Sequence, residues 1–463
     1  MRINTNVIAL SVRTQLLKTD SAISKASLMM SSGLKINSAK DDAAGLAIGN
    51  KLDRQVRGYE KVSNNTSDGI SLIQTLDGAL SSVNEMLEEM RTLAVQSSNG
   101  TLEDSDRRKI QTEIEELKEE ISDLSKRTEF NGIKLLDGDG ARLTYDKTGS
   151  ATKLSKVNYV SGNVPQGQLE FTIDSLGSSA SVAFSEASIS AGTEGTLTIN
   201  GSTLTFTGDE SKEEILESIK QACEDNNLDI DLSTGTVTSR IIGSEATINI
   251  TSNPASFGFA SSVSSTGTDA VVSGITLNDL ETGAGINSFN SGISSTTYVE
   301  GNRVYINSTN GQKIEVDLTG NGTGAQKIEI RNEGQIKIQV GTQMDMEIDL
   351  YVRNIDTDSL GIEYINLSTQ SGAADAITKI DEAVSKVLDQ RTYLGAAQNR
   401  LAFTETAIDT AALNTEEAYS RVMDVDMAKA MTDLSAENVK SQAALAILTQ
   451  ANQRPQQILQ LLG

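Results

Sequence analysis

The stretch "LDRQVRGYEKVSNNTSDGISLIQTLDGALSSVNEMLEEMRTLA", residues 52–94, decides the fold. Its seven-residue repeat follows two seams, one from Leu52 to Ala94 and the other from Gln55 to Met90. Ten of the thirteen seam positions are apolar. A repeat sustained over this length predicts one long helix that packs against other helices. The Asn-Gly pair at 99–100 then supplies a helix stop.

A second helix is predicted to follow from about residue 105. Its apolar residues are spaced alternately four and three apart: Ile110, Ile114, Leu117, Ile121 and Leu124. The Asn-Gly pair at 131–132 marks its end. Because the connection is short, the two helices are expected to form an antiparallel hairpin.

Toward the other end of the chain the seven-residue repeat returns. One seam holds Ile380, Val387, Leu394, Leu401 and Ile408, and Ile377 and Val384 begin its partner. The partner seam then becomes polar at Arg391, Gln398 and Glu405. Two interpretations stay open: the helix turns this face to solvent, or its polar residues fix the register against a neighbouring helix.

Residues 141–365 change character and become rich in Ser, Thr and Gly with period-two alternation. "GTLTINGSTLTF", residues 195–206, predicts a hairpin with a type I′ turn at Asn200-Gly201. "SKEEILESIKQACED" predicts one helix, with Ile215, Ile219 and Cys223 four residues apart. Further strands are predicted in "EATINIT", "RVYINST", "QKIEIR", "QIKIQV" and "MEIDLYV". This region is therefore expected to form one or two β-rich domains.

The helices from the two ends of the chain are expected to meet. Neither the N-terminal pair nor the C-terminal helix can bury a continuous apolar seam alone. The predicted fold class is therefore α+β. Long N- and C-terminal helices form a coiled-coil-like bundle, with a β-rich region inserted between them.

The net charge of −24 argues against two classes of partner. Residues 1–140 and residues 366–463 each carry −4, so the remaining −16 lies in residues 141–365. Such a surface repels phosphates, so neither nucleic-acid binding nor docking on an anionic membrane is predicted. The N-terminus has no unbroken apolar run and no small-residue cleavage site, so neither a signal peptide nor membrane insertion is expected.

Catalytic and metal chemistry have no candidate residues. The chain has no His, which excludes His-dependent triads, HExxH sites and His-containing zinc sites. It has one Cys, Cys223, which is expected to pack in a helix rather than react. We therefore predict no cofactor, no metal and no enzymatic activity.

The two helical ends resemble bacterial flagellin. The matching stretches are "INTNVIALSVRTQL", "SSGLKINSAKDDAAGLAIGNKL", "SDGISLIQTLDGALSSVNEMLEEMRTLAVQSSNGT", "DRRKIQTEIEELKEEISDLSKRTEFNGIKLLDG", "LGAAQNRLAFT", "AYSRVMDVDMA" and "QANQRPQQILQLLG". The resemblance implies a structural subunit that polymerises into the flagellar filament for motility. It also implies export of the unfolded chain through the flagellar type III secretion channel to the extracellular flagellum. The implied partners are other copies of the chain in a helical homopolymer, an export chaperone, and the cap and hook-junction proteins.

The resemblance also implies a division of the chain. Residues 1–35 and 420–463 form inner-core helices that stay disordered until assembly. Residues 36–160 and 366–419 form a helical-bundle core domain with a β-hairpin, and residues 161–365 form the variable β-rich outer domain or domains. The side chains expected to pack between subunits are Val12, Leu16, Ile23, Leu28, Met427, Met431, Leu434, Leu445, Leu448, Ile458 and Leu462. The alternative is a coiled coil of the two ends within one chain.

One segment departs from the family pattern. Many flagellins recognised by the animal innate receptor carry "LQRxRELAVQ", and this chain has "LEEMRTLAVQ". Leu93 and Glu113 match receptor-contact positions, but Glu89 replaces a family arginine. Because this reverses a charge at a contact, we expect weakened receptor binding.

Two alternative functions stay open. A hook-filament junction protein would share the helical ends without polymerising indefinitely. The unbroken match in "SSGLKINSAKDDAAGLAIGNKL" favours the filament subunit. A surface adhesin or secreted enzyme would use the central region as its active module. The lack of His disfavours the enzyme, whereas glycan or host binding by the β-rich region stays open.

Overall fold

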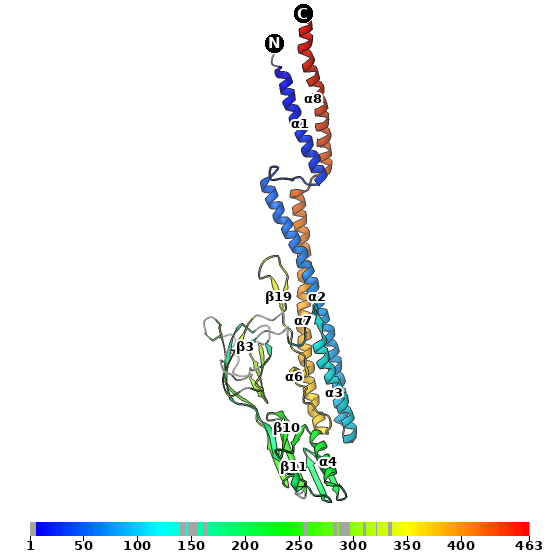
Figure 1. Ribbon diagram of the computed structural model, residues 1–463, viewed down its shortest axis with the longest axis vertical. Coiled ribbons are helices and arrows are strands. Elements are labelled where there is room, and N and C mark those ends of the chain that lie inside the picture. The colour runs from blue at the N-terminus through cyan, green and yellow to red at the C-terminus, as the bar shows by residue number, and fades with distance from the viewer. Residues whose placement is uncertain are drawn as a thin grey trace. The chain divides into compact units, whose positions relative to one another are not determined.

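A computed structural model of the chain is shown in Figure 1. It describes residues 6–138, 144–146, 156–160, 164–253, 257–280, 285–286, 297–308, 312–320, 322–331 and 336–462. The chain forms two compact units. Unit 1 comprises Met1–Ser67, Gln339–Glu347 and Leu401–Gly463, and unit 2 comprises Asp68–Ile338 and Ile348–Arg400. None of the helices in the described ranges is long and apolar enough to cross a bilayer.

Long helices occupy both ends of the chain, as predicted. They are α1 (Val7–Ser32), α2 (Ala43–Ser97) and α3 (Asp104–Arg127) on the N-terminal side, and α7 (Gln370–Met423) and α8 (Met427–Leu462) on the C-terminal side. The helix predicted over 52–94 lies within α2, and the helix predicted from residue 105 is α3. A short helix, α6 (Thr357–Leu360), precedes α7.

The apolar seams form the helical core of unit 2. The α2 side chains are fully buried at Ile73, Leu76, Leu80, Val83, Leu87 and Met90. From α7, Ile380, Val387 and Leu394 are equally buried, and α3 contributes Ile114 and Ile121. This confirms that the N-terminal and C-terminal helices meet. Burying a side chain of this size contributes about 1.5–3 kcal/mol, so the core residues dominate the stability of the bundle.

Polar contacts on the partner seam set the register of α2 against α7. In unit 2, Arg391 Nε donates to Asp77 Oδ1 at 2.8 Å. In unit 1, Ser67 Oγ donates to Glu405 Oε1 at 2.7 Å. Of the two interpretations of the polar seam, the contacts of Arg391 and Glu405 support register fixing. Gln398 is half-buried on the same helix.

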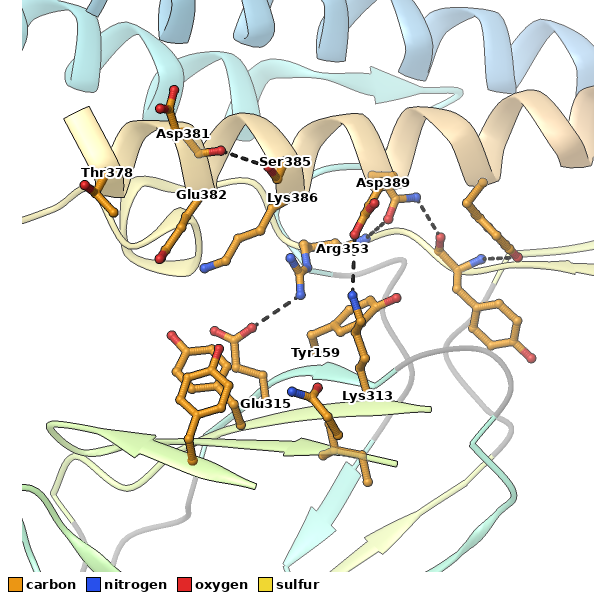
Figure 2. Close-up of a pocket in the computed structure, with 17 residues that line it drawn as sticks. Tyr159, Lys313, Glu315, Arg353, Thr378, Asp381, Glu382, Ser385, Lys386 and Asp389 are labelled. Atoms are coloured by element: carbon orange, nitrogen blue, oxygen red, sulfur yellow. Dashed lines mark hydrogen bonds and ion pairs between the residues drawn. The ribbon is translucent and has the colours of Figure 1, made fainter. Parts of the chain in front are cut away.

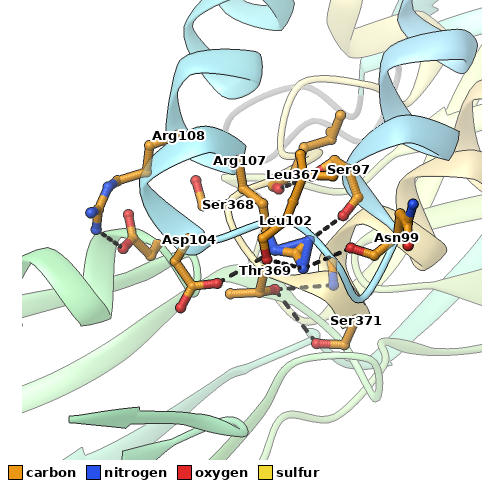
Figure 3. Close-up of polar contacts among 12 residues, drawn as sticks. Ser97, Asn99, Leu102, Asp104, Arg107, Arg108, Leu367, Ser368, Thr369 and Ser371 are labelled. Atoms are coloured by element: carbon orange, nitrogen blue, oxygen red, sulfur yellow. Dashed lines mark hydrogen bonds and ion pairs between the residues drawn. The ribbon is translucent and has the colours of Figure 1, made fainter. Parts of the chain in front are cut away.

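The end of α2 is closed by a buried arginine, as Figure 3 shows. The Arg107 side chain is only 4% exposed and donates to the carbonyl oxygen of Ser97. Its Nη2 also donates to the carbonyls of Asn99 and Leu102, each at 3.0 Å. The last carbonyls of a helix have no hydrogen-bond donor within it and carry partial negative charge. A guanidinium supplies both the missing donors and a positive charge.

The β-rich region of unit 2 contains several small sheets. Its strands are β1 (Glu129–Phe130), β2 (Ile133–Lys134), β3 (Thr144–Asp146), β4 (Lys156–Val160), β5 (Gly167–Ser175), β6 (Ser179–Ala183), β7 (Glu194–Ile199), β8 (Ser202–Thr207), β9 (Leu228–Asp231), β10 (Thr236–Ile242), β11 (Thr247–Asn253), β12 (Ser262–Thr266), β13 (Val271–Asn278), β14 (Tyr298–Glu300), β15 (Arg303–Asn307), β16 (Lys313–Asp317) and β17 (Gly324–Ile330). The helix α4 (Lys212–Glu224) and a 3-10 turn at Glu186–Ser188 interrupt them. β18 (Ile336–Gln339) and β19 (Glu347–Leu350) form a two-stranded sheet.

The strands surround two separate hydrophobic cores. Sheets β6-β10-β9 and β12-β11-β7-β8 enclose the first, together with α4. Sheets β13-β5-β17-β3 and β14-β15-β16-β4 enclose the second. Each core is mostly aliphatic, as expected for a chain with 4% aromatic residues. The central region therefore packs as two layered β-rich parts.

Local signals in this region were predicted correctly. β7 pairs with β8 in an antiparallel hairpin, and Asn200 and Gly201 both have positive φ angles of 46° and 93°, as a type I′ turn requires. The helix α4 begins with a capping box between Ser211 and Glu214. Cys223 is buried in the first β-rich core, and burial raises the pKa of its thiol to about 12. It is therefore a packing residue.

We predict that Arg107→Lys lowers the free energy of unfolding by about 2–4 kcal/mol, because one ammonium cannot reach the carbonyls that the planar guanidinium satisfies. The adjacent Arg108→Lys is the matched control. Arg108 is 41% exposed and pairs with Asp225 at 2.9 Å, so its replacement is expected to cost under about 1 kcal/mol. Urea unfolding followed by circular dichroism measures both. Equal midpoints for the two variants would contradict the capping role.

Candidate assembly surface

The helix α1 is fixed at its start by one asparagine. The Asn6 side-chain oxygen accepts a hydrogen bond from Ala9 N at 3.1 Å, which caps the helix. The Asn6 amide donates to the carbonyl of Ala451 on α8 at 2.8 Å. The first turn of α1 is therefore tied to α8 within unit 1.

Two helix breaks in unit 1 are joined to each other. The first follows α1 at Gly33, whose φ of 72° ends the helix in the left-handed conformation. The second separates α7 from α8 at residues 424–426. Lys35 N donates to the carbonyl of Met423 at 2.6 Å, and Val425 N donates to that of Gly33 at 3.0 Å. The backbone thus connects the α1–α2 break to the α7–α8 break.

An ion pair fixes the loop after α1. Lys25 Nζ lies 2.9 Å from Asp41 Oδ1, and Ser38 Oγ donates to Asp41 Oδ2 at 3.0 Å. These hydrogen bonds, that from Lys25 first, lower the pKa of the Asp41 carboxyl from 3.8 to about 2. The charged carboxylate is therefore the form that the loop favours.

The helices α1 and α8 lie side by side, as Figure 1 shows, and their contact uses small residues. Thr19 and Ala26 of α1 and Ala430 and Ala451 of α8 are buried. Larger apolar side chains on the same helices are half-buried at Val12, Leu16, Ile23, Leu434 and Leu448. Small side chains let two helices approach closely but bury little apolar area, so this pairing has a thin core.

Ten other large apolar side chains of α1 and α8 are exposed. They are Val7, Ile8, Leu10, Leu17, Leu28, Met427, Met431, Val439, Leu445 and Ile447, each between 47% and 66% exposed, and we call them the terminal apolar set. Soluble monomers rarely expose so many large apolar residues on two paired helices. The set is therefore a candidate surface for contact with a partner.

The predicted packing residues divide between these two surfaces. Leu28, Met427, Met431 and Leu445 belong to the terminal apolar set. Val12, Leu16, Ile23, Leu434 and Leu448 are half-buried on the two paired helices. The side chains of Ile458 and Leu462 lie outside the described part of the structure. The sequence pattern alone does not separate the exposed residues from the half-buried ones, and their packing between subunits stays a prediction.

Six members of the terminal apolar set were missed: Val7, Ile8, Leu10, Leu17, Val439 and Ile447. Their signal was adjacency. Val7-Ile8 and Leu16-Leu17 are apolar pairs, and neighbouring residues on a helix point about 100° apart. A pair therefore cannot lie wholly on one seam. Apolar pairs in α1 indicate a helix that is apolar on more than one face.

The receptor-contact candidates lie on α2 and α3 of unit 2. Glu89 and Glu113 are exposed, whereas Leu93 is 6% exposed and packs in the helical core. In this conformation the two carboxylates, and not Leu93, offer a surface to a partner. In the described ranges, no group of three or more Asp, Glu or Cys residues is arranged to hold a metal ion.

Comparison with known proteins identifies both ends of the chain. Residues 3–141 match the model of the bacterial flagellin N-terminal helical region, and residues 377–462 match that of the C-terminal helical region. A flagellin of Clostridium tyrobutyricum is 34% identical over 98% of this chain and 100% of its own length. A flagellin of Bacillus subtilis (strain 168) is 30% identical over 100% of both chains. The solved structure of flagellar hook associated protein-3 from Legionella pneumophila covers 81% of this chain and 98% of its own, with 13% identity and a TM-score of 0.32.

We predict that the pKa of Asp41 is about 2 in the folded chain. Because this value lies below the ordinary 3.8, the stabilisation from the ionised carboxylate is present above pH 3.8 and is lost as the pH falls through about 2. Carboxyl carbon chemical shifts measured against pH test this. Lys25→Gln is expected to move the value back toward 3.8, since it removes the largest cause. A wild-type titration midpoint near 4 would contradict the prediction.

Proposed function

The chain belongs to the bacterial flagellin family and is a structural subunit of the flagellar filament, and we propose that it enters the filament through the terminal apolar set of α1 and α8. The observation that carries this proposal is the exposure of ten large apolar side chains on two helices whose mutual contact is thin. Other copies of the chain present the same helices and are therefore the partners whose chemistry fits.

Burial of the terminal apolar set between subunits favours assembly. Each member is about half exposed, so covering it contributes about 1 kcal/mol, and ten members contribute roughly 10 kcal/mol per chain. Two surfaces on one subunit that contact two different neighbours produce an open helical polymer rather than a closed ring, if the rotation does not close. This matches the filament geometry that the family implies.

We further propose that residues 1–35 and 420–463 are disordered in the free monomer and become helical on assembly. The α1–α8 contact relies on small residues such as Ala26 and Ala451, so it offsets little of the ordering cost of about 1–2 kcal/mol per residue. Neighbouring subunits would supply the missing apolar contacts. The same weak local folding suits export of an unfolded chain through the flagellar secretion channel, with an export chaperone holding the free ends.

The central charge suits an outer position in the filament. Residues 141–365 carry −16 of the total −24, whereas each helical end carries −4. We propose that the nearly neutral ends pack densely and that the acidic region faces solvent, where mutual repulsion limits bundling of filaments. Cap and hook-junction proteins are the proposed partners at the two ends of the polymer.

Two other functions remain distinguishable from the proposed one. A hook-filament junction protein would add a few copies and stop, so extended filaments from purified chain would exclude it. An adhesin would act through the β-rich region and would keep its binding when the ends are removed. An enzyme is disfavoured because the chain contains no His and its single Cys is a packing residue.

We predict that Leu445→Glu prevents filament growth. Leu445 is 50% exposed on α8, and placing a charge in an apolar contact is expected to raise the critical monomer concentration by tenfold or more. The control is Gln442→Glu, which adds the same charge at an exposed position one turn earlier. Sedimentation after seeded polymerisation measures the monomer that remains. Equal critical concentrations for the two variants would contradict the proposed interface.

We propose that recognition by the animal innate receptor is weakened by Glu89. We predict that Glu89→Arg strengthens receptor binding by about tenfold, because it removes an unfavourable charge from an exposed position on α2. Glu88→Arg makes the same charge change at the neighbouring exposed position and is expected to have a smaller effect. Titration of each variant with the receptor ectodomain tests this. The prediction is refuted if the Glu89→Arg variant binds the receptor with the same affinity as the wild-type chain.

A further inference from the structure

A row of three tyrosines and one glutamate crosses the sheet β14-β15-β16-β4 in unit 2. Tyr298 pairs with Tyr305, Tyr305 with Glu315, and Glu315 with Tyr159 along successive strands. Side chains at directly paired positions lie on the same face of a sheet. The neighbouring positions, including Val304 and Val316, point to the opposite face and belong to the second β-rich core. The aromatic row therefore faces away from that core.

The opposite wall is a polar face of α7, as Figure 2 shows. Thr378, Glu382, Ser385 and Asp389 follow one another at spacings of four, three and four, which places them on one side of the helix. Lys386 lies beside them, with its Nζ 5.9 Å from the ring centre of Tyr305. Between the two walls is a pocket of about 580 Å³. This volume is within the usual range for small-molecule sites.

The tyrosine wall provides a stacked pair of aromatic rings with polar edges. The Tyr298 and Tyr305 rings stack with centroids 4.6 Å apart and planes inclined by 14°. Tyr351 and Tyr393 line the same pocket. Burial raises the pKa of the Tyr305 phenol, and burial raises that of Tyr393 to about 12. The phenols therefore stay protonated at neutral pH and can both donate and accept hydrogen bonds.

A buried carboxylate in this row lacks part of its hydrogen bonding. Glu315 is 4% exposed, and its Oε2 accepts a 3.3 Å hydrogen bond from Arg353 Nη2. Its Oε1 has no hydrogen-bond partner among the described residues. Figure 2 shows the carboxylate of Glu315 pointing from the sheet toward α7. A buried carboxylate oxygen without a partner costs free energy, so the position favours a ligand that donates a hydrogen bond.

The charges of the pocket argue against an ionic ligand. Arg353 already lies 4.1 Å from the centre of the Tyr159 ring. Lys386 Nζ donates to the carbonyls of Ser359 and Leu360, and Lys313 Nζ lies 3.5 Å from Asp389. The cations of the protein are therefore already placed against rings, carbonyls and carboxylates. An added cation would compete with Arg353 and Lys386, and an added anion would approach Glu315 and Glu382.

We propose that this pocket binds a neutral saccharide, with one sugar face on the outer ring of the Tyr298–Tyr305 stack, that of Tyr298, and its hydroxyl groups toward Glu315 and α7. A pyranose ring has an apolar face of C–H groups that packs on aromatic rings and an edge of hydroxyls that donate and accept. Glu382 is exposed and makes no hydrogen bond or ion pair among the described residues, so its carboxylate is available to accept from a second hydroxyl. The proposal concerns the β-rich region and is independent of filament assembly.

The composition of the chain supplies the assay. It contains no Trp, and five of its nine tyrosines line this pocket, so intrinsic tyrosine fluorescence reports directly on the site. The full-length chain is titrated with glucose, N-acetylglucosamine and lactose, each to about 50 mM, with saturation-transfer NMR as a second readout. We expect saturable binding of at least one sugar, with a dissociation constant of about 1–10 mM.

Two variants test the assignment of the site. Tyr298→Ala removes the outer ring of the stack at a residue that is 54% exposed, and we expect affinity to fall by about tenfold. Glu382→Gln weakens a hydroxyl acceptor and is expected to lower affinity by about threefold. The matched control is Tyr364→Ala, since Tyr364 is 52% exposed and lies outside the pocket. Circular dichroism confirms that each variant is folded.

Three outcomes would overturn the proposal. The first is no saturable binding of any of the three sugars by the wild-type chain. The second is binding that Tyr298→Ala leaves unchanged. The third is tighter binding of choline chloride, used as a cationic probe, than of any sugar. Loss of binding in Tyr298→Ala, with binding retained in Tyr364→Ala, supports it.

Discussion

The packing of α2 against α7 is the constraint on which the rest of the structure depends. The two helices come from opposite ends of the chain, and each carries an apolar seam whose exposure to water is unfavourable. Leu80, Leu87 and Val387 are among the residues that this contact buries completely. Everything between the two helices must therefore begin and end near the bundle. This is why a β-rich region of more than two hundred residues is an insertion and not an appended domain.

Much of this architecture is predictable from sequence because its signals are local and repeated. The heptads predicted α2 and α7, Asn200-Gly201 predicted a type I′ hairpin, and the four-residue spacing of Ile215, Ile219 and Cys223 predicted α4. The division of α1 and α8 into an inner and an outer face was not predictable. It depends on which residues the partner helix covers, and in a helix that is apolar on several faces the pattern alone does not identify that side. The complete tyrosine row was not predictable either. Tyr298 and Tyr305 are close in sequence, but Tyr159 joins them only because β4 pairs with β16, more than a hundred residues further along the chain.

Two kinds of surface on this molecule use opposite chemistry. The terminal apolar set presents aliphatic side chains without charge, and it suits close contact with identical neighbours. The β-rich region carries most of the negative charge and places its hydroxyl-rich and aromatic residues around a pocket. Separating these surfaces along the chain lets one region change its binding properties while the other keeps the geometry that assembly needs.

The long insertion between α2 and α7 has a consequence for how the molecule matures. The part of the α2 seam that packs on α7 has no partner until α7 has emerged, although α3 follows α2 directly. The helices α2 and α7 are separated by roughly 270 residues of sequence. Closure of so long a loop adds little entropy cost over a shorter one, but it cannot begin early. A chain truncated before α7 therefore leaves this apolar part of the α2 seam exposed to water. Exposed apolar surface is the type of feature that cellular proteases and chaperones recognise. The order of the parts thus means that only a chain that reaches α7 can cover this part of the seam in its folded state.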